Sequence, residues 1–281
     1  MKRRHRKKIL IVMAVVLILC IAELIRSNTY IQTENITFSS GNIPESFNNC
    51  KIVQISDYHN QGSNFRKRLI SIIDSIDPDY IFLTGDISDS FCTDIDAADD
   101  FLEEISETAP CYLVWGNHDY RIDSRLLDKM RGCADKNNIV VLEDDFTYIS
   151  RGTDKVLITG TVSDPSSDAA RSMLDRYPHE DAFSVWLHHY PEDFEKITDL
   201  SRVNGCQADL VFCGHAHGGL IRFPFIKGLY APGQGFFPEY TRGSYEYKGT
   251  QMIVSAGVGN SSITKRFLDP FHLVVCTLEK T

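Results

Sequence analysis

The sequence lacks several features that would indicate other kinds of protein. It has no internal repeat and no low-complexity tract, which argues against a solenoid or a largely disordered chain. None of its eight cysteines forms a Cys-x-x-Cys pair, so a zinc knuckle is not expected. Positive charge is scarce, with 29 basic against 38 acidic residues, and an acidic chain binds nucleic-acid phosphates poorly. We therefore expect no nucleic-acid partner, and no pattern indicates an oligomeric state.

The cysteines do not indicate a disulfide-stabilised fold. Cys20 lies in an apolar N-terminal run, and three others lie in apolar runs typical of core strands: Cys111, Cys213 and Cys276. The remaining four could pair, although the sequence gives no connectivity: Cys50, Cys92, Cys133 and Cys206. With 281 residues, 43% of them hydrophobic, the chain can bury one large core or two smaller ones.

The N-terminus predicts a membrane segment. Six basic residues between positions 2 and 8 precede an unbroken apolar stretch over residues 9–22, which two more apolar residues extend toward the length of a spanning helix. Small residues suited to signal-peptide cleavage are missing around Ala22, Leu19 stands before Cys20 where a lipoprotein needs a small residue, and the flanks of the arginine pair do not fit a twin-arginine signal. We predict an uncleaved anchor over residues 1–26, with a cleaved signal peptide as the alternative.

Charge predicts the orientation of this anchor, because basic residues beside a short first segment stay in the cytoplasm. The N-terminus is then cytoplasmic, and the rest of the chain lies outside at the cell membrane. The first eight residues hold six of the 29 basic residues and none of the 38 acidic ones. The outer part is therefore strongly acidic, with a net charge of about −15.

Hydrophobic periodicity predicts an α/β domain. Residues 27–49 are polar and suit a tether with one leading strand, and the domain itself is expected over residues 50–281. Helical spacing over residues 64–76 and 95–105 alternates with apolar strands, which indicates a parallel sheet with crossover helices. A further helix is expected near residues 126–130. Strands in quick succession then predict a second sheet, at residues 139–142, 146–149, 156–161, 220–223, 252–256 and 271–278.

Five apolar strands each end in a short turn that carries Asp or His. The central turn is Gly116-Asn117-His118-Asp119, after the apolar run 111–115. The other four, in chain order, are Asp57-Tyr58-His59, Gly85-Asp86 with Asp89, His188-His189-Tyr190-Pro191, and Gly214-His215-Ala216-His217. The carboxyl edge of an open α/β sheet is where such proteins place their ligand sites. We therefore expect these turns to meet in one site.

These turns, in this order, resemble the motifs of the calcineurin-like metallophosphoesterases, D-x-H, G-D-x-x-D, G-N-H-D, H-x-P and G-H-x-H, and the resemblance covers roughly residues 50–278. The segments 218–224 and 254–259 are similar to the bacterial membrane-associated branch of that family. The resemblance implies a four-layer α/β/β/α sandwich of two mixed sheets, preceded here by one N-terminal transmembrane segment. It also implies a metal-dependent phosphoester hydrolase.

The turns offer carboxylates, imidazoles and one amide as metal ligands, and no thiolate. This donor set suits Mn²⁺, Fe or Zn²⁺, and seven ligands are too many for one such ion but suit two. By resemblance, one metal takes Asp57, His59, Asp86 and His217. The second takes Asp86, Asn117, His215 and one histidine of the pair 188–189. The residues alone leave that pair open, and the family spacing H-x-P-E favours His189 over His188.

The resemblance also implies a mechanism. Two metals generate a bridging hydroxide that attacks phosphorus in line, and His118 protonates the leaving group. Asp119 is expected to orient His118. Asp89 either holds a ligand or is a solvated loop carboxylate. Three arginines contact phosphate or form surface ion pairs: Arg222, Arg242 and Arg266.

One further stretch bears on the substrate. Phe223-Pro224-Phe225-Ile226 and Gly235-Phe236-Phe237-Pro238 follow the last turn, and they either pack over the core or form an apolar rim for a lipid tail or a bilayer. With the anchor, this predicts a phosphoester substrate that is a phosphodiester or pyrophosphate of a lipid or envelope precursor. The alternatives are a broad phosphomonoesterase, a nucleotide phosphodiesterase, or a non-catalytic scaffold on the same fold.

Overall fold

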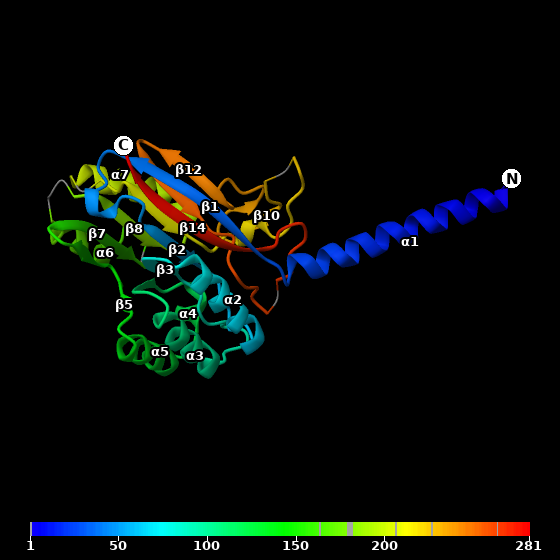
Figure 1. Ribbon diagram of the computed structural model, residues 1–281, viewed down its shortest axis with the longest axis horizontal. Coiled ribbons are helices and arrows are strands. Elements are labelled where there is room, and N and C mark those ends of the chain that lie inside the picture. The colour runs from blue at the N-terminus through cyan, green and yellow to red at the C-terminus, as the bar shows by residue number, and fades with distance from the viewer. Residues whose placement is uncertain (1, 163, 179–181, 206, 226, 263) are drawn as a thin grey trace.

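The computed structural model of the protein describes residues 2–162, 164–178, 182–205, 207–225, 227–262 and 264–281. Cys206, a candidate for disulfide pairing, and Ile226, in the possible apolar rim, lie outside these residues. Two six-stranded sheets form the centre of the molecule, and helices lie outside them (Figure 1). Both sheets mix parallel and antiparallel pairs, as the sequence predicted.

The first sheet has the order β1-β14-β2-β3-β4-β5. Its pairs are parallel except β14 with β2. The strands β2, β3 and β4 carry the first three turns at their carboxyl ends. The bounds are β1 Ile31–Ser40, β2 Lys51–Ile55, β3 Tyr80–Thr84, β4 Cys111–Val114, β5 Val140–Val141 and β14 Phe271–Lys280.

The second sheet has the order β12-β13-β9-β8-β7-β6. Its outer pairs are antiparallel and its inner pairs parallel, so β8 and β9 present their carboxyl ends together. A separate pair, β10 with β11, lies in the loop after β9. The bounds are β6 Asp145–Arg151, β7 Asp154–Thr161, β8 Ser184–His188, β9 Leu210–Cys213, β10 Tyr230–Ala231, β11 Gly235–Phe236, β12 Gly243–Tyr247 and β13 Thr250–Val254.

The helices cover the two outer faces. Buried residues of α2 (Ser63–Ile76), α3 (Ile95–Ser106) and α5 (Ser124–Lys136) pack in one cluster with the first sheet. Those of α6 (Asp168–Asp175) and α7 (Phe194–Val203) pack with the second. Helix α3 begins where the Asp94 side chain accepts a hydrogen bond from Ala97 N, an ordinary N-cap. The shorter helices are α4 Asn117–Arg121, η1 Glu45–Phe47, η2 Pro191–Asp193 and η3 His217–Gly219.

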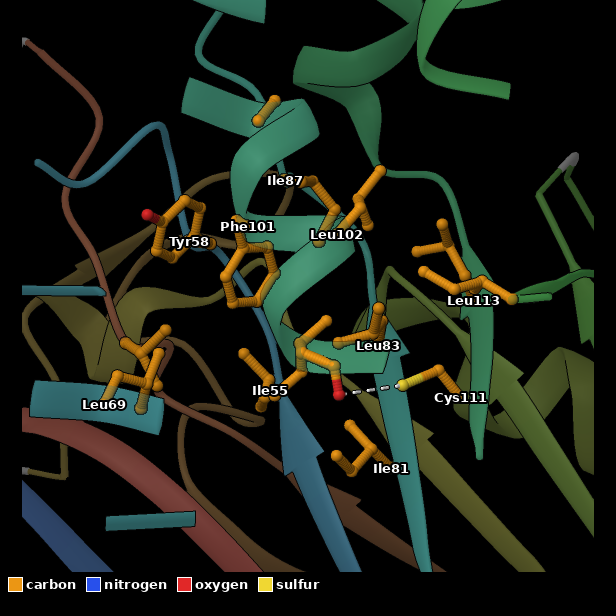
Figure 2. Packing of buried hydrophobic residues seen from close by; sticks show 14 of the residues in the cluster. Ile55, Tyr58, Leu69, Ile81, Leu83, Ile87, Phe101, Leu102, Cys111 and Leu113 are labelled. Atoms are coloured by element: carbon orange, nitrogen blue, oxygen red, sulfur yellow. Dashed lines mark hydrogen bonds between the residues drawn. The ribbon is translucent and has the colours of Figure 1, made fainter. Parts of the chain in front are cut away.

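The core on the first sheet shows why α3 docks where it does (Figure 2). The ring of Phe101 stacks on Tyr58, with centroids 4.0 Å apart, and Leu102 is fully buried beside it. The Cys111 thiol lies 3.8 Å from the carbonyl of Ile105 at the end of the helix. Apolar positions spaced at helical intervals in α3 therefore fix the helix over β2, β3 and β4.

A third buried cluster lies between the sheets. It joins side chains of both, among them Phe82 of β3 and Phe212 of β9, whose ring centroids are 5.4 Å apart. The order helix, sheet, sheet, helix is thus the predicted four-layer sandwich. This packing brings the carboxyl ends of β2, β3 and β4 to those of β8 and β9.

Residues 27–49, expected as a polar tether with one leading strand, contain that strand as β1, which pairs along its whole length with β14, and Phe38, Ile43 and Phe47 are buried between the sheets. Polar residues alternate there because one face of an edge strand is solvated. Two of the strands expected in the second sheet, at residues 139–142 and 271–278, belong to the first sheet as β5 and β14. The strand expected over residues 220–223 is a single bridge, Ile221 with Phe267. Leu220 has a φ of 60°, which breaks the extended run.

Helix α1 (Lys2–Ser27) leaves the body as a long separate helix (Figure 1). Within the described residues, Arg4–Ser27 is the one helix long and apolar enough to cross a membrane, with a mean hydropathy of 2.8 in its most apolar window. None of that window is buried against the protein. The candidate anchor is therefore an apolar helix without a protein partner.

The cysteines follow the expectation of buried thiols in part. All seven cysteines within the described ranges are free. Cys111, Cys213 and Cys276 are buried in strands, and burial raises the pKa of the Cys111 and Cys276 thiols to about 12. Of the candidates for pairing, Cys50 is buried and Cys92 is exposed.

Candidate metal centre

The five predicted turns lie together at the meeting edges of the two sheets. Their backbone is unusual: five of the seven predicted ligands have φ between 44° and 64°, in the left-handed region that residues with side chains rarely adopt. They are Asp57, His59, Asp86, His215 and His217. Non-glycine residues held in this conformation cluster at functional sites, because the surrounding structure must enforce it. The conformation turns each side chain from its strand end into the shared space.

Glycines let the turns approach one another. A Cβ added at Gly116 would lie 2.2 Å from Asp86 Oδ1, and one at Gly214 would lie 1.7 Å from Ser56 Oγ and 2.8 Å from Asp57 Oδ2. Any larger residue at these positions would push the carboxylates away. The close approach of the turns thus requires glycine at both positions.

The predicted ligands form two adjoining groups. In the first, Nε2 of His217 lies 3.6 Å and Nε2 of His59 lies 4.0 Å from Oδ1 of Asp57. In the second, Nε2 of His189 lies 3.3 Å from Oδ2 of Asp86. His59 Nε2 is 3.7 Å from the same oxygen, so Asp86 lies between the groups. Candidate ligand atoms within each group, Asp57 with His59 and His217, and Asp86 with His189 and His215, all lie within 4.8 Å of one another.

Several of these atoms are buried without a hydrogen-bond partner. They are Asp57 Oδ1, Asp86 Oδ2 and both ring nitrogens of His59. Leaving such groups unpaired costs free energy, and two carboxylates side by side repel each other. Oxygen and imidazole donors that converge with free lone pairs are what a divalent cation requires. The residues present therefore fit a metal centre.

Burial sets the protonation of the imidazoles. It lowers the pKa of His59 to about 4 and that of His215 to about 3, so both are neutral at pH 7, the form that binds metals. Burial also raises the pKa of Asp57 to about 6. At His189 burial acts the same way as at His59, but the Asp86 carboxylate outweighs it and raises the pKa to about 10.

The histidine pair divides between two environments. His189 points into the site, and its Nδ1 lies 2.7 Å from the carbonyl of Thr84, which leaves Nε2 toward Asp86. His188 is equally buried but faces the other way, with Nδ1 2.9 Å from Thr161 Oγ1 and Nε2 3.5 Å from Asp193. Successive residues at a strand end point to opposite sides, which explains the division.

The central turn forms the first turn of α4. Asn117 stands at its start, and one terminal amide atom lies 2.8 Å from Nδ1 of His215, at the edge of the second group. The backbone N–H of His118 donates to Asp86 Oδ1 at 2.8 Å. This contact holds the central turn against the carboxylate that lies between the two groups.

Asp89, and not Asp119, contacts His118. Asp89 Oδ1 lies 3.3 Å from His118 Nδ1, and Ser90 Oγ lies 3.1 Å from the same nitrogen. The other Asp89 oxygen accepts hydrogen bonds from the N–H and hydroxyl of Ser262, both at 2.7 Å. Asp89 is nearly fully buried, so it is not a solvated loop carboxylate.

Asp119 instead holds backbone. Its carboxylate accepts hydrogen bonds from Gly116 N at 2.9 Å, Ser88 N at 2.8 Å and Ser88 Oγ at 3.0 Å. The expectation that Asp119 orients His118 is therefore wrong. The side chain of Asp119 turns back to tie the loops after β3 and β4 together, whereas His118 points out toward the pocket.

The three arginines proposed from the sequence are all engaged within the protein. Arg222 donates to the Gly218 carbonyl and to Thr241, and Arg242 donates to Glu34. Arg266 is fully buried, and its Nη2 lies 3.2 Å from Nδ1 of His217. These contacts assign them structural tasks beside the site.

A pocket opens over the two ligand groups, with a volume of about 470 Å³. Arg121 lines it, four residues after Asn117 and hence on the same side of the α4 turn. The sequence reasoning missed this arginine, although the helical spacing from Asn117 was available. Leu220, Tyr230 and Pro232 form another wall, and they belong to the segment after the last turn.

Comparison with known proteins connects this site to one protein family. The profile of calcineurin-like phosphoesterases matches residues 50–219. The metallophosphoesterase YkuE of Bacillus subtilis is 28% identical over 261 residues, covering 89% of this chain and 86% of YkuE. The phosphodiesterase YaeI of Escherichia coli is 26% identical over 186 residues, covering 65% of this chain and 64% of YaeI. The solved structure of TT1561 from Thermus thermophilus matches with a TM-score of 0.51 at 13% identity, over 75% of this chain and 89% of that chain.

Proposed function

Because this chain belongs to the calcineurin-like phosphoesterase family and is a metal-dependent phosphoesterase, we propose that it hydrolyses a phosphodiester or pyrophosphate of a lipid or envelope precursor while anchored in the membrane by α1. The observation that carries this proposal is the pocket. Its floor holds convergent ligand atoms, and one wall belongs to a segment that also carries exposed aromatic side chains. Such a pocket suits a phosphoester with an apolar portion.

Two divalent cations are assigned to the site. One takes Asp57, His59, Asp86 and His217, and the other takes Asp86, Asn117, His189 and His215. The absence of thiolates from the set favours Mn²⁺, Fe or Zn²⁺. When bound, such a pair supplies a hydroxide nucleophile and neutralises phosphate charge.

His118 is assigned to protonate the leaving group. Its Nδ1 is held by Asp89 and Ser90, which leaves Nε2 for the substrate side. An alkoxide needs a proton as it departs, and imidazole side chains exchange protons near neutral pH. Arg121 is assigned to bind phosphate oxygens from the pocket wall, a task that its guanidinium geometry suits.

A substrate panel tests the proposal. The full chain, reconstituted in vesicles with Mn²⁺, should hydrolyse a lipid-linked pyrophosphate or lipid phosphodiester faster than nucleotides or sugar phosphates. Faster hydrolysis of nucleotides would favour a nucleotide phosphodiesterase, and absence of hydrolysis with two metals bound would favour a non-catalytic scaffold. Either result overturns the proposed substrate class.

Topology is tested separately. A reporter fused after Thr281 should be active only outside the cytoplasm, because the basic N-terminus stays inside. Cytoplasmic activity of the reporter would contradict the proposed location and direct the search to cytosolic phosphoesters.

A further inference from the structure

Four phenylalanines after the last metal-binding turn are exposed. The exposed fractions are 45% for Phe223, 99% for Phe225, 71% for Phe236 and 67% for Phe237. We call these four residues the aromatic face. Apolar side chains of this size are normally buried, and a group of them on one exposed segment marks an interaction surface.

The segment that carries the aromatic face is held by backbone hydrogen bonds. Leu229 N donates to the carbonyls of Gly219 and Ile221, and Phe237 N donates to the carbonyl of Leu229. The pair β10 with β11 closes the segment, and the ring of Phe236 contacts Tyr230. Backbone hydrogen bonds therefore tie this segment to the body on both sides of Phe225.

The aromatic face is connected to the base of α1 through residues 266–269. Phe267 exchanges backbone hydrogen bonds with Leu220 and Arg222, on the side of the aromatic face. The preceding residue, Arg266, makes two hydrogen bonds with Asn28. Its backbone N–H donates to Asn28 Oδ1 at 3.1 Å, and its carbonyl accepts from Asn28 Nδ2 at 2.8 Å. In Figure 1, α1 leaves the body on the side where β10 and its loops lie.

The base of α1 also fixes where the bilayer surface lies. Asn28 Nδ2 donates to the carbonyl of Leu24 in α1, so one side chain joins the end of the apolar helix to the body. Asp269 N donates to the hydroxyl of Ser27, a second joint at the same place. Because the apolar helix ends at this joint, the body meets the headgroup layer there.

Basic side chains lie on the segments that connect to this joint, in a chain that is acidic overall. Arg26 lies in the last turn of α1, where it pairs with Glu23 at 2.8 Å, and Arg68 of α2 donates to the carbonyl of Thr29. Lys265 and Lys227 are exposed on the two loops just described. Such a distribution suits anionic lipid headgroups.

We propose that the aromatic face inserts into the bilayer that holds α1. Aromatic side chains favour the boundary between headgroups and acyl chains, and nearby basic groups favour the lipid phosphates. Leu220 and Tyr230 of the same segment line the pocket, so the metal centre then opens at the membrane surface. The role of this opening in admitting a lipid substrate rests on the proposed hydrolysis, whereas the membrane contact rests only on the proposed anchoring by α1.

Fluorescence quenching by lipid tests the contact. Both native tryptophans, Trp115 and Trp186, are buried, so an introduced tryptophan is the one that can reach lipid. Phe225→Trp in the full chain, reconstituted in vesicles with bromines at shallow acyl positions, should lose roughly half or more of its added emission, since interfacial side chains reach that depth. The matched control is Val203→Trp, at the end of α7 and 85% exposed, which should lose none.

Equal quenching of the two variants would overturn the proposal, including the case in which another protein covers the aromatic face. Two further variants separate this outcome from failure of the proposed function. Replacing Phe223, Phe236 and Phe237 by serine in the Phe225→Trp variant should abolish the quenching. Replacing all four phenylalanines by serine should slow hydrolysis of a lipid phosphoester, but not of a soluble p-nitrophenyl diester. Quenching without hydrolysis of any lipid phosphoester would refute the substrate and support the contact.

Discussion

The metal-binding turns and the segment that follows the last of them differ in every physical respect. In the turns the predicted ligands are buried, and an added Cβ at Gly214 would collide with Ser56. In the segment Phe225 is almost fully exposed, and at Gly235 an added Cβ would meet nothing within 4 Å. The turns hold all the predicted metal ligands within the chain. The segment, by the proposal above, makes its main contact with the bilayer.

In the proposed function, this difference assigns the two regions different tasks in one reaction. Chemistry needs donors fixed within tenths of an ångström, which close packing and left-handed backbone supply. Contact with a fluid bilayer needs exposed apolar area near the anchor and little geometric precision. Substitutions should therefore have large, specific effects in the turns and small effects on soluble substrates in the segment.

The largest effect is expected at the histidine pair. His189→Ala should lose bound metal and reduce hydrolysis of every phosphoester to the background rate, because His189 lies against Asp86. His188→Ala is the matched control, since His188 is equally buried but faces Thr161. It should keep two metals per chain and lower thermal stability instead. Metal content measured by mass spectrometry decides which of the two histidines binds metal. Loss of metal from His188→Ala alone would reverse the assignment.

The next effect concerns the leaving group. His118→Ala should keep both metals and slow hydrolysis of alkyl phosphoesters by about 10²- to 10⁴-fold, the usual contribution of a general acid. It should slow p-nitrophenyl esters much less, because p-nitrophenolate departs without a proton. Parallel kinetics on the two substrate classes check this. Equal losses, or a missing metal, would show that His118 positions phosphate or binds metal.

A smaller effect is expected at the carboxylate that holds His118. Asp89→Asn should cost roughly 10- to 100-fold on alkyl esters and little on p-nitrophenyl esters, as for groups that orient a functional imidazole. Asp119→Asn should instead lower the melting temperature and leave the ratio of the two rates unchanged, because Asp119 holds backbone. If Asp119 were the partner of His118, Asp119→Asn would change the ratio of the alkyl-ester rate to the p-nitrophenyl-ester rate, and Asp89→Asn would not.

The smallest effect is expected in the segment. Phe225→Ser should change hydrolysis of a soluble diester by less than about twofold and the free energy of unfolding by less than about 0.5 kcal/mol, as for an exposed site away from the core. Steady-state kinetics and thermal denaturation measure both. A large loss of activity on the soluble diester would mean that Phe225 shapes the pocket. The turns and the segment would then not have separate effects on activity.

Much of this protein can be predicted from local sequence. Helices α2, α3 and α5 follow from apolar residues at helical spacing, and the strands from short apolar runs. The turns that carry Asp57, Asp86 and His215 were found because residue type and order suffice to identify them. One strand was expected before the domain, but its pairing with β14 was not, because an edge strand with one solvated face carries a weak apolar pattern.

By itself, the sequence determined the strand ends, the donor set and the apolar helix, because each depends on neighbours within a few residues. The four-layer class followed from the family resemblance of the motifs. Only the tertiary structure decided that Asp89 holds His118, that Arg266 contacts His217, and that Asn28 joins the end of α1 to the loop beside the aromatic face. These pairs are 29, 49 and 238 residues apart, and spacing along a chain does not specify which side chains packing will bring together.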